Sequence, residues 1–92
     1  MSELKVKVNN LRSPRTGNEI PNQFKIRIGN DTYFQSYDSI IVKQTPEKTY
    51  LDNYYWNYSR MTSKYRGVFL GENTNATRQK ISSGEYKLIN LN

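Results

Sequence analysis

The chain has 92 residues, of which 35% are hydrophobic and 13% aromatic, and its 14 Lys and Arg against 8 Asp and Glu give a net charge of +6. A chain of this length forms one small domain, and the absence of cysteine excludes disulfide frameworks and thiolate metal sites. No apolar run reaches the length of a signal peptide or a membrane span, so we expect a soluble cytoplasmic protein with no membrane partner; its positive charge favours acidic partners.

The first part of the chain, residues 1–53, has the pattern of strands. Apolar residues alternate with cations in two segments, "LKVKV" at 4–8 and "FKIRI" at 24–28. Such alternation is typical of strands with one buried face. We therefore expect both segments to bury their apolar residues and to direct their cations outward.

Turn residues divide the rest of this part into further strands. Gly29-Asn30-Asp31 predicts a hairpin over residues 23–37, and "SIIVKQ" at 39–44 predicts the next strand. The sequence "TPEK" then predicts a turn into a short strand, "TYLD", at 49–52.

A long connection is predicted between the first two strands. The segment "NNLRSPRTGNEIPNQ" at 9–23 is rich in turn-forming residues and contains two of the three prolines. A loop of this length is usually functional or mobile. Its part at 12–18, with Arg12 and Arg15, could form a binding tip or an ordinary solvated connection.

Residues 59–84 have the pattern of helices. An apolar stripe at helical spacing predicts a helix that begins near Ser59 or Thr62 and ends at Gly71, and the stripe consists of Met61, Tyr65, Val68 and Phe69. A second helix is predicted from a cap at Asn73 or Thr74 to Gly84, and "EYKLINL" at 85–91 closes the chain as a strand. We therefore expect an α+β fold over residues 1–92: a small antiparallel sheet of about four or five strands with two short helices in the C-terminal half.

Residues suited to catalysis are scarce. Without His and Cys, the chain lacks the commonest general base and the thiolate nucleophile. Four carboxylates could hold Mg²⁺ for a nuclease, but each stands at a turn or strand end, where acidic residues are common: Asp31, Asp38, Glu47 and Asp52. We therefore predict a non-catalytic protein with no cofactor and no metal, and keep a metal-dependent nuclease as the minor alternative.

The five-residue run "YYWNY" at 54–58 holds the densest group of rings. If the run is extended, alternate side chains face opposite sides, so Tyr54, Trp56 and Tyr58 would face the core and only Tyr55 would be exposed. We therefore predict Trp56 as a core residue and Tyr55 as a surface contact.

Three segments of the chain have a recognisable pattern: "YFQSYDSIIV" at 33–42, "YWNYSRMTSKYRGVFLGE" at 55–72 and "KISSGEYKLINLN" at 80–92, with a weaker match in "SPRTGN" at 13–18. In these segments the chain resembles a family of short proteins encoded by bacteriophages and other bacterial mobile elements. Met61 stands where the family pattern has threonine. The resemblance implies a mobile-element origin, a bacterial host cytoplasm and a compact fold, and it implies no particular activity.

Two functions fit these observations. The first is a protein that binds a host nucleic-acid-handling or defence complex and inhibits or modulates it, with rings as anchors and cations matched to an acidic groove. The second is an accessory protein that binds DNA or RNA directly through cations on a sheet face and a helix face. The residues predicted to contact the partner are Lys5, Lys7, Arg12, Arg15, Lys25, Arg27, Tyr55, Arg60 and Lys64.

Overall fold

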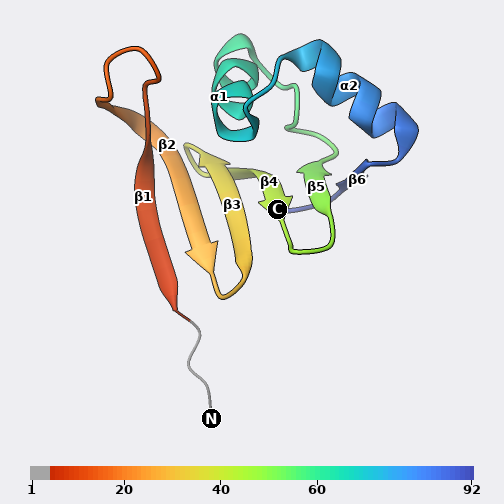
Figure 1. Cartoon of the computed structure of the whole chain (residues 1–92), viewed down its shortest axis with the longest axis horizontal. Coiled ribbons are helices and arrows are strands. Elements are labelled where there is room, and N and C mark those ends of the chain that lie inside the picture. Colours follow the sequence, from red (N-terminus) through yellow and green to blue (C-terminus); the bar gives the residue numbers. More distant parts are fainter. Residues whose placement is uncertain (1–4) are drawn as a thin grey trace.

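The computed structural model describes residues 5–92, which form one sheet of six strands and two helices (Figure 1). In chain order the elements are β1 (Val6–Arg12), β2 (Glu19–Ile28), β3 (Asp31–Ser36), β4 (Ser39–Gln44), β5 (Thr49–Asp52), α1 (Arg60–Leu70), α2 (Thr74–Ser83) and β6 (Tyr86–Ile89). The predicted α+β class is confirmed, with six strands instead of four or five. Neighbouring strands are antiparallel except β5 and β6, which are parallel because both helices lie between them in the chain.

Local turn signals predict most strands of the first half correctly. The β2–β3 hairpin turns at Gly29, whose positive φ of 61° suits glycine. β4 and β5 occupy the predicted ranges. In the turn between them, the Thr45 hydroxyl accepts the Lys48 backbone N–H at 3.0 Å.

The long loop predicted between the first two strands is wrong in its extent. β1 continues to Arg12 and β2 begins at Glu19, which leaves residues 13–18 as the connection. The pairing is irregular after Asn10, whose side-chain amide donates to the Ile20 carbonyl at 2.9 Å. A bulge of this kind accommodates turn-forming residues inside a strand, which is why their local signal suggested a loop.

Both helices begin and end at the predicted capping residues. Ser59 caps α1 and Asn73 caps α2, and each side chain accepts a backbone N–H of the first turn, at 3.1 and 2.8 Å. Gly71 and Gly84 end the helices with φ values of 71° and 85°. Across residues 5–92, neither helix has the length and apolar character that crossing a membrane requires.

The turn between the helices positions a buried carboxylate. A Cβ on Gly67 would lie 2.8 Å from the Glu72 carbonyl oxygen, so glycine permits the close return of the chain. The Glu72 carboxylate accepts Lys80 Nζ at 2.7 Å, the Tyr86 hydroxyl at 2.8 Å and the Thr77 hydroxyl at 2.6 Å. Burial alone would raise the pKa of Glu72, but these hydrogen bonds outweigh burial and lower it. Glu72 therefore joins α2 to β6.

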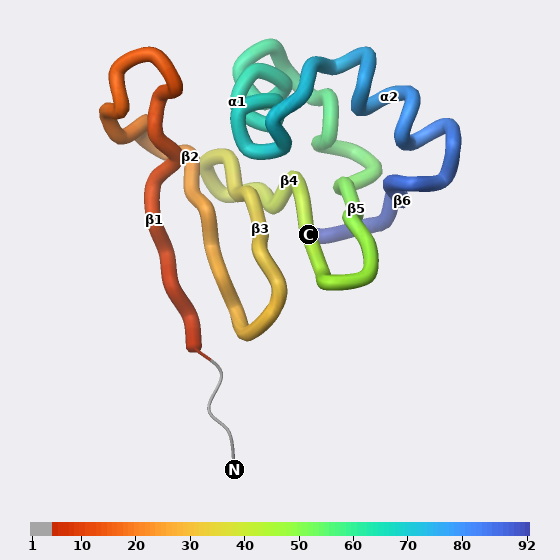
Figure 2. The backbone as a smooth tube through the Cα atoms, viewed as in Figure 1, coloured from red at the N-terminus to blue at the C-terminus, as the bar shows by residue number. Residues whose placement is uncertain are grey.

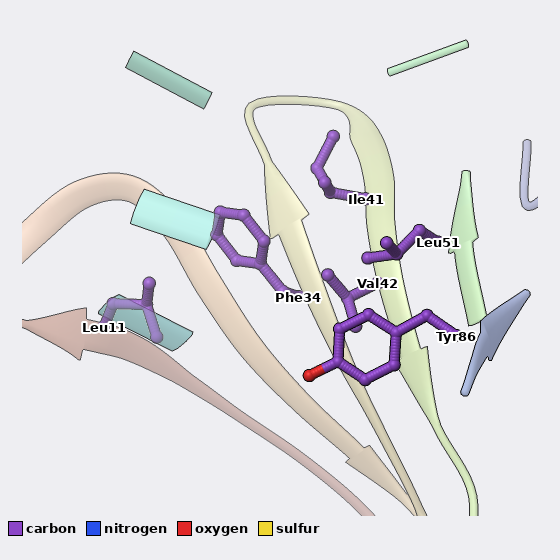
Figure 3. Close-up of a cluster of buried hydrophobic side chains, with 6 residues drawn as sticks. All are labelled: Leu11, Phe34, Ile41, Val42, Leu51 and Tyr86. Atoms are coloured by element: carbon purple, nitrogen blue, oxygen red, sulfur yellow. The ribbon is translucent and has the colours of Figure 1, made fainter. Parts of the chain in front are cut away.

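The core lies between the helices and one face of the sheet, and its buried apolar side chains are shown in Figure 3: Leu11, Phe34, Ile41, Val42, Leu51 and Tyr86. Phe34 is fully buried and stacks on Phe69 of α1, with ring centroids 5.6 Å apart. β4 contributes two successive core residues, Ile41 and Val42, because the pairing of β3 with β4 shifts register beside Phe34.

The apolar stripe predicted on α1 is only partly right. Three of its members are half-buried against the core, namely Tyr65, Val68 and Phe69. Met61 is 49% exposed, whereas the buried residues of the helix are Thr62 and Arg66. The helix is therefore rotated toward Arg66, whose guanidinium finds hydrogen-bond partners described below.

The expected burial of the first strands is confirmed for β2, where Phe24, Ile26 and Ile28 are half-buried and the cations between them are exposed, but it is wrong for β1. The face that each side chain occupies also differs from the expectation. Lys25 pairs with Phe34 across β2 and β3 and therefore lies on the face that the helices cover. Val6 and Val8 lie on the opposite face, which no helix of residues 5–92 covers, and they are 61% and 56% exposed. α1 lies beside the loop end of the β1–β2 hairpin and α2 lies at the opposite side of the molecule (Figure 1), so the rest of the hairpin has no helix to pack against. Leu4, also part of this prediction, lies outside the described residues.

Candidate functional site

A broad concavity runs along the exposed side of α1. Its volume is about 1060 Å³, and it is bordered by α1, by the start of α2 and by Pro14 of the connection at 13–18. This connection curls beside α1 (Figure 2). Arg60 and Lys64, both predicted to contact a partner, line the concavity from successive turns of α1. We call this concavity the basic groove.

A smaller concavity of about 340 Å³ lies between α1 and the sheet. Arg12 and Lys25 line it, and Val68 lines both this concavity and the basic groove, so the two adjoin. Lys7 and Arg27, which pair across β1 and β2, lie on the same face of the sheet as Lys25. The structure thus brings the sheet cations and the helix cations, predicted as separate patches, to one side of the molecule.

Most of these cations have no carboxylate partner. Within residues 5–92, ion pairs up to 4.0 Å involve only Arg12 with Glu19, at 3.6 Å, and Lys80 with two carboxylates. Arg12 also donates to the Gly17 carbonyl at 2.9 Å, so its side chain stabilises the connection at 13–18. The predicted contact residues without such a carboxylate are Lys5, Lys7, Arg15, Lys25, Arg27, Arg60 and Lys64. Their charge is available to a partner.

The Asp52 side chain sets the conformation of the rings that follow β5. Its Oδ2 accepts the backbone N–H groups of Tyr54 and Tyr55 at 3.0 and 2.8 Å, and the Trp56 N–H donates to the Asp52 carbonyl at 3.0 Å. The segment therefore forms a series of tight turns instead of an extended strand. Tyr54 and Tyr58 are 67% and 61% exposed, whereas Tyr55 and Trp56 are half-buried against the core. The predicted arrangement, with only Tyr55 exposed, is wrong because it assumed an extended segment.

The last residues of the chain complete the environment of Asp52. Its carboxylate accepts the Leu91 N–H at 2.8 Å and the Asn92 side-chain amide at 3.1 Å. Burial alone would raise the pKa of Asp52, but the hydrogen bonds from both segments outweigh burial and lower it. Asn92 also bonds the backbone N–H and carbonyl of Ile40, at 2.8 and 2.9 Å. Asp52 therefore ties the rings to the C-terminal residues and, through them, to β4.

Arg66 is a buried cation on α1 and was not among the residues predicted to contact a partner. Its guanidinium donates to the Trp56 carbonyl and, at 2.9 Å, to the Thr74 hydroxyl, and it lies 5.2 Å from the Trp56 ring centroid. Arg78 lies 5.4 Å from the same ring. Burial lowers the pKa of Arg66. One sequence feature could have indicated this contact: the chain has a single Trp and an Arg on both predicted helices, and guanidinium groups pack on Trp faces.

A third concavity, of about 410 Å³, is formed by the β3–β4 turn, the rings after β5 and the start of α1. Tyr37, Tyr55 and Tyr58 line it together with Asp38 and other small polar residues. Tyr58 also lines the basic groove, as does its neighbour Ser59, so the two concavities adjoin there. We call this third concavity the ring pocket.

The uncovered face of the β1–β2 hairpin is a different kind of surface. Val6 pairs with Ile28 and Val8 with Ile26, and Tyr33 of β3 continues the same row. Apolar residues on an uncovered face of this kind are typical of interaction surfaces. We call this surface the open face.

The carboxylates considered for a metal site do not converge. Within residues 5–92 no three acidic side chains lie close enough together to hold a metal ion, and Asp52 is engaged in the hydrogen bonds described above. Comparison with known proteins found no matching family model, no matching curated protein and no matching solved structure. The function is therefore inferred from the charges, rings and concavities of the surface.

Proposed function

We propose that this chain is a non-catalytic binding protein that engages single-stranded nucleic acid along its basic side. The observation that carries the proposal is the junction of the two cation-lined concavities at Val68. Through it, Arg60 and Lys64 of α1 and Lys25 of β2 lie along one side, without carboxylates within 4.0 Å among residues 5–92. A phosphate backbone is the partner that such a row of cations suits best.

The exposed rings favour a single strand over a duplex. Tyr58 lines the basic groove beside Arg60, and its ring is 61% exposed. Bases of a single strand are free to stack on such a ring, which typically contributes about 1–3 kcal/mol per base, whereas paired bases are already stacked. Cations in a groove with an exposed ring at its edge are the usual composition of a single-strand binding surface.

A second candidate function is favoured by the open face. Val6 and Val8 are more than half exposed in a chain with a small core, which suits a protein partner. Under this proposal the partner is a host protein or nucleoprotein complex that handles nucleic acid or defends the cell, and the chain inhibits or modulates it. The resemblance to proteins of bacteriophages supports a target of this kind.

Affinity purification from a bacterial lysate, with and without nuclease, distinguishes the two candidates. Direct binding predicts that nucleic acid is recovered and that associated proteins disappear after nuclease treatment. A titration of purified protein with a fluorescent oligothymidine should show an association constant that falls with salt, with a logarithmic slope of roughly −0.7 per phosphate bound. Recovery of one protein regardless of nuclease, with no oligonucleotide binding, would overturn the first proposal and support the second.

A further inference from the structure

The ring pocket adjoins the basic groove, so a strand lying in the groove can direct a base into the pocket. Tyr58 and Ser59 line both concavities. The groove is lined by Arg60 and Lys64 and by Glu72, whose carboxylate accepts Lys80 Nζ, whereas the pocket is lined by Asp38 and by no basic residue. A phosphate would be repelled from the pocket, and an uncharged group that donates hydrogen bonds would be accepted there.

The rings of the pocket suit a planar ligand. Tyr37 and Tyr58 are 50% and 61% exposed, and Tyr55 supports Tyr58 in an edge-to-face contact with centroids 5.4 Å apart. The volume of about 410 Å³ lies within the usual range of small-ligand sites. A nucleobase has the planar π-surface that stacks on such rings.

Two polar groups of the pocket have no protein partner among residues 5–92. Asp38 forms no ion pair up to 4.0 Å within residues 5–92. The Ser36 hydroxyl is buried, at 5% residue exposure, and makes no hydrogen bond. The side-chain amide of Gln23, which pairs with Ser36 across β2 and β3, is also buried without a partner among residues 5–92. Buried hydroxyls usually bond to protein, water or a ligand, so Ser36 offers a bonding group at the pocket.

The backbone at the edge of the pocket is held by two hydrogen bonds. Tyr37 has a positive φ of 55° although it is not glycine. Its N–H donates to the Asn22 carbonyl at 2.7 Å, and the Gln35 amide donates to its carbonyl at 2.6 Å. Tyr37 and Asp38 form the two-residue turn between β3 and β4, where a positive φ is usual, and the two hydrogen bonds fix them at the edge of the pocket.

We propose that the ring pocket receives a guanine base of the bound strand, stacked on Tyr58, with the Asp38 carboxylate accepting the guanine N1–H and N2–H groups. This inference rests on the proposed binding of single-stranded nucleic acid. Guanine is the base whose Watson–Crick edge presents two adjacent donors, and a carboxylate presents two acceptor oxygens with matching spacing. Adenine and cytosine present one amino group beside an acceptor, and thymine presents a single N–H between two carbonyls.

The test compares oligothymidine strands that carry one central guanine, one central inosine or no substitution. Inosine keeps the N1–H of guanine and lacks the N2 amino group. We expect the guanine strand to bind more tightly than the unsubstituted strand by roughly five- to a hundredfold, the range of a good bidentate base contact, and inosine to fall between them.

Two pairs of variants locate the contact. Asp38→Asn should abolish the guanine preference, whereas Glu47→Gln, which removes the same charge from the β4–β5 turn, should retain it. Tyr58→Ala should weaken every strand and reduce the preference, whereas Tyr33→Ala, which removes a ring on the open face, should retain the preference. Tight binding of all strands with no guanine preference would overturn this inference and leave the proposed function standing. Absence of binding to any strand would overturn both.

Discussion

The β1–β2 hairpin and the C-terminal half use similar residues in opposite ways. In the hairpin, Val6 and Val8 are exposed and the neighbouring cations have no carboxylate partner within residues 5–92. In the C-terminal half, the buried carboxylates of Asp52 and Glu72 are each held by several hydrogen bonds. The difference indicates that the contacts around the helices contribute most to stability. The hairpin instead presents exposed valines and unpaired cations that a partner could contact.

The largest expected effect on stability comes from the core beneath α1. Phe34→Ala should lower the free energy of unfolding by about 3–5 kcal/mol, because Phe34 is fully buried and stacks on Phe69. Val8→Ala in the hairpin should change it by no more than about 0.5 kcal/mol. Urea denaturation of both variants measures the contrast, and equal losses would show that the hairpin is part of the cooperative core.

A smaller effect is expected from the buried carboxylates, and it depends on pH. The pKa values of Asp52 and Glu72 lie below their ordinary values, so the unfolded chain binds more protons than the folded one at acidic pH. Their stabilisation is fully present above about pH 5 and is lost as the pH falls through the folded pKa values. Thermal melts between pH 7 and pH 2 should show this loss.

The Asp52→Asn variant tests how much of the loss of stability in acid is due to Asp52. The variant should lose about 1–3 kcal/mol at neutral pH, because the amide cannot accept all the N–H groups that Asp52 accepts. Its stability should also vary less with acid than that of the parent protein. Glu47→Gln, at an exposed turn, is the control. An acid profile of Asp52→Asn identical to that of the parent would contradict the assignment.

Charge reversal on the basic side, which we define by Arg60 and Lys64 of α1 and Lys25 and Arg27 of β2, should have the smallest effect on stability. It should have a large effect on binding. Two double variants, Arg60→Glu with Lys64→Glu and Lys25→Glu with Arg27→Glu, should each change stability by no more than about 0.5 kcal/mol per residue. Each should weaken oligothymidine binding, and the magnitude of the salt slope should fall by about 0.7 for every phosphate that the variant no longer binds.

The matched control reverses the same charge on the other face of the sheet. Lys43 and Lys87 both pair with Tyr50, on the face opposite Phe34. Lys43→Glu with Lys87→Glu should therefore weaken binding less than either variant of the basic side. If all three double variants weaken binding equally, the strand responds to net charge alone and the basic side has no special role.

Local signals in the sequence determined the elements of this protein. Ser59, Gly71, Asn73 and Gly84 mark the helix ends, because capping depends on residues within a single turn. The alternation of Val and Lys in β1 likewise determined that a strand with one apolar side forms there. The exposure of Arg60 and Lys64 on α1 could be predicted, because both residues lie off the apolar stripe of the helix.

Only the tertiary structure decided which way these elements face and what they bring together. Alternation cannot tell which side of a strand a helix will cover, and the lower part of the hairpin lies beyond both helices, so its apolar side stays exposed. The coiled conformation of the rings depends on Asp52, the burial of Arg66 depends on Trp56 and Thr74, and the ring pocket joins segments distant in the chain. Such contacts are absent from any local pattern, because their energy arises only when separate elements pack.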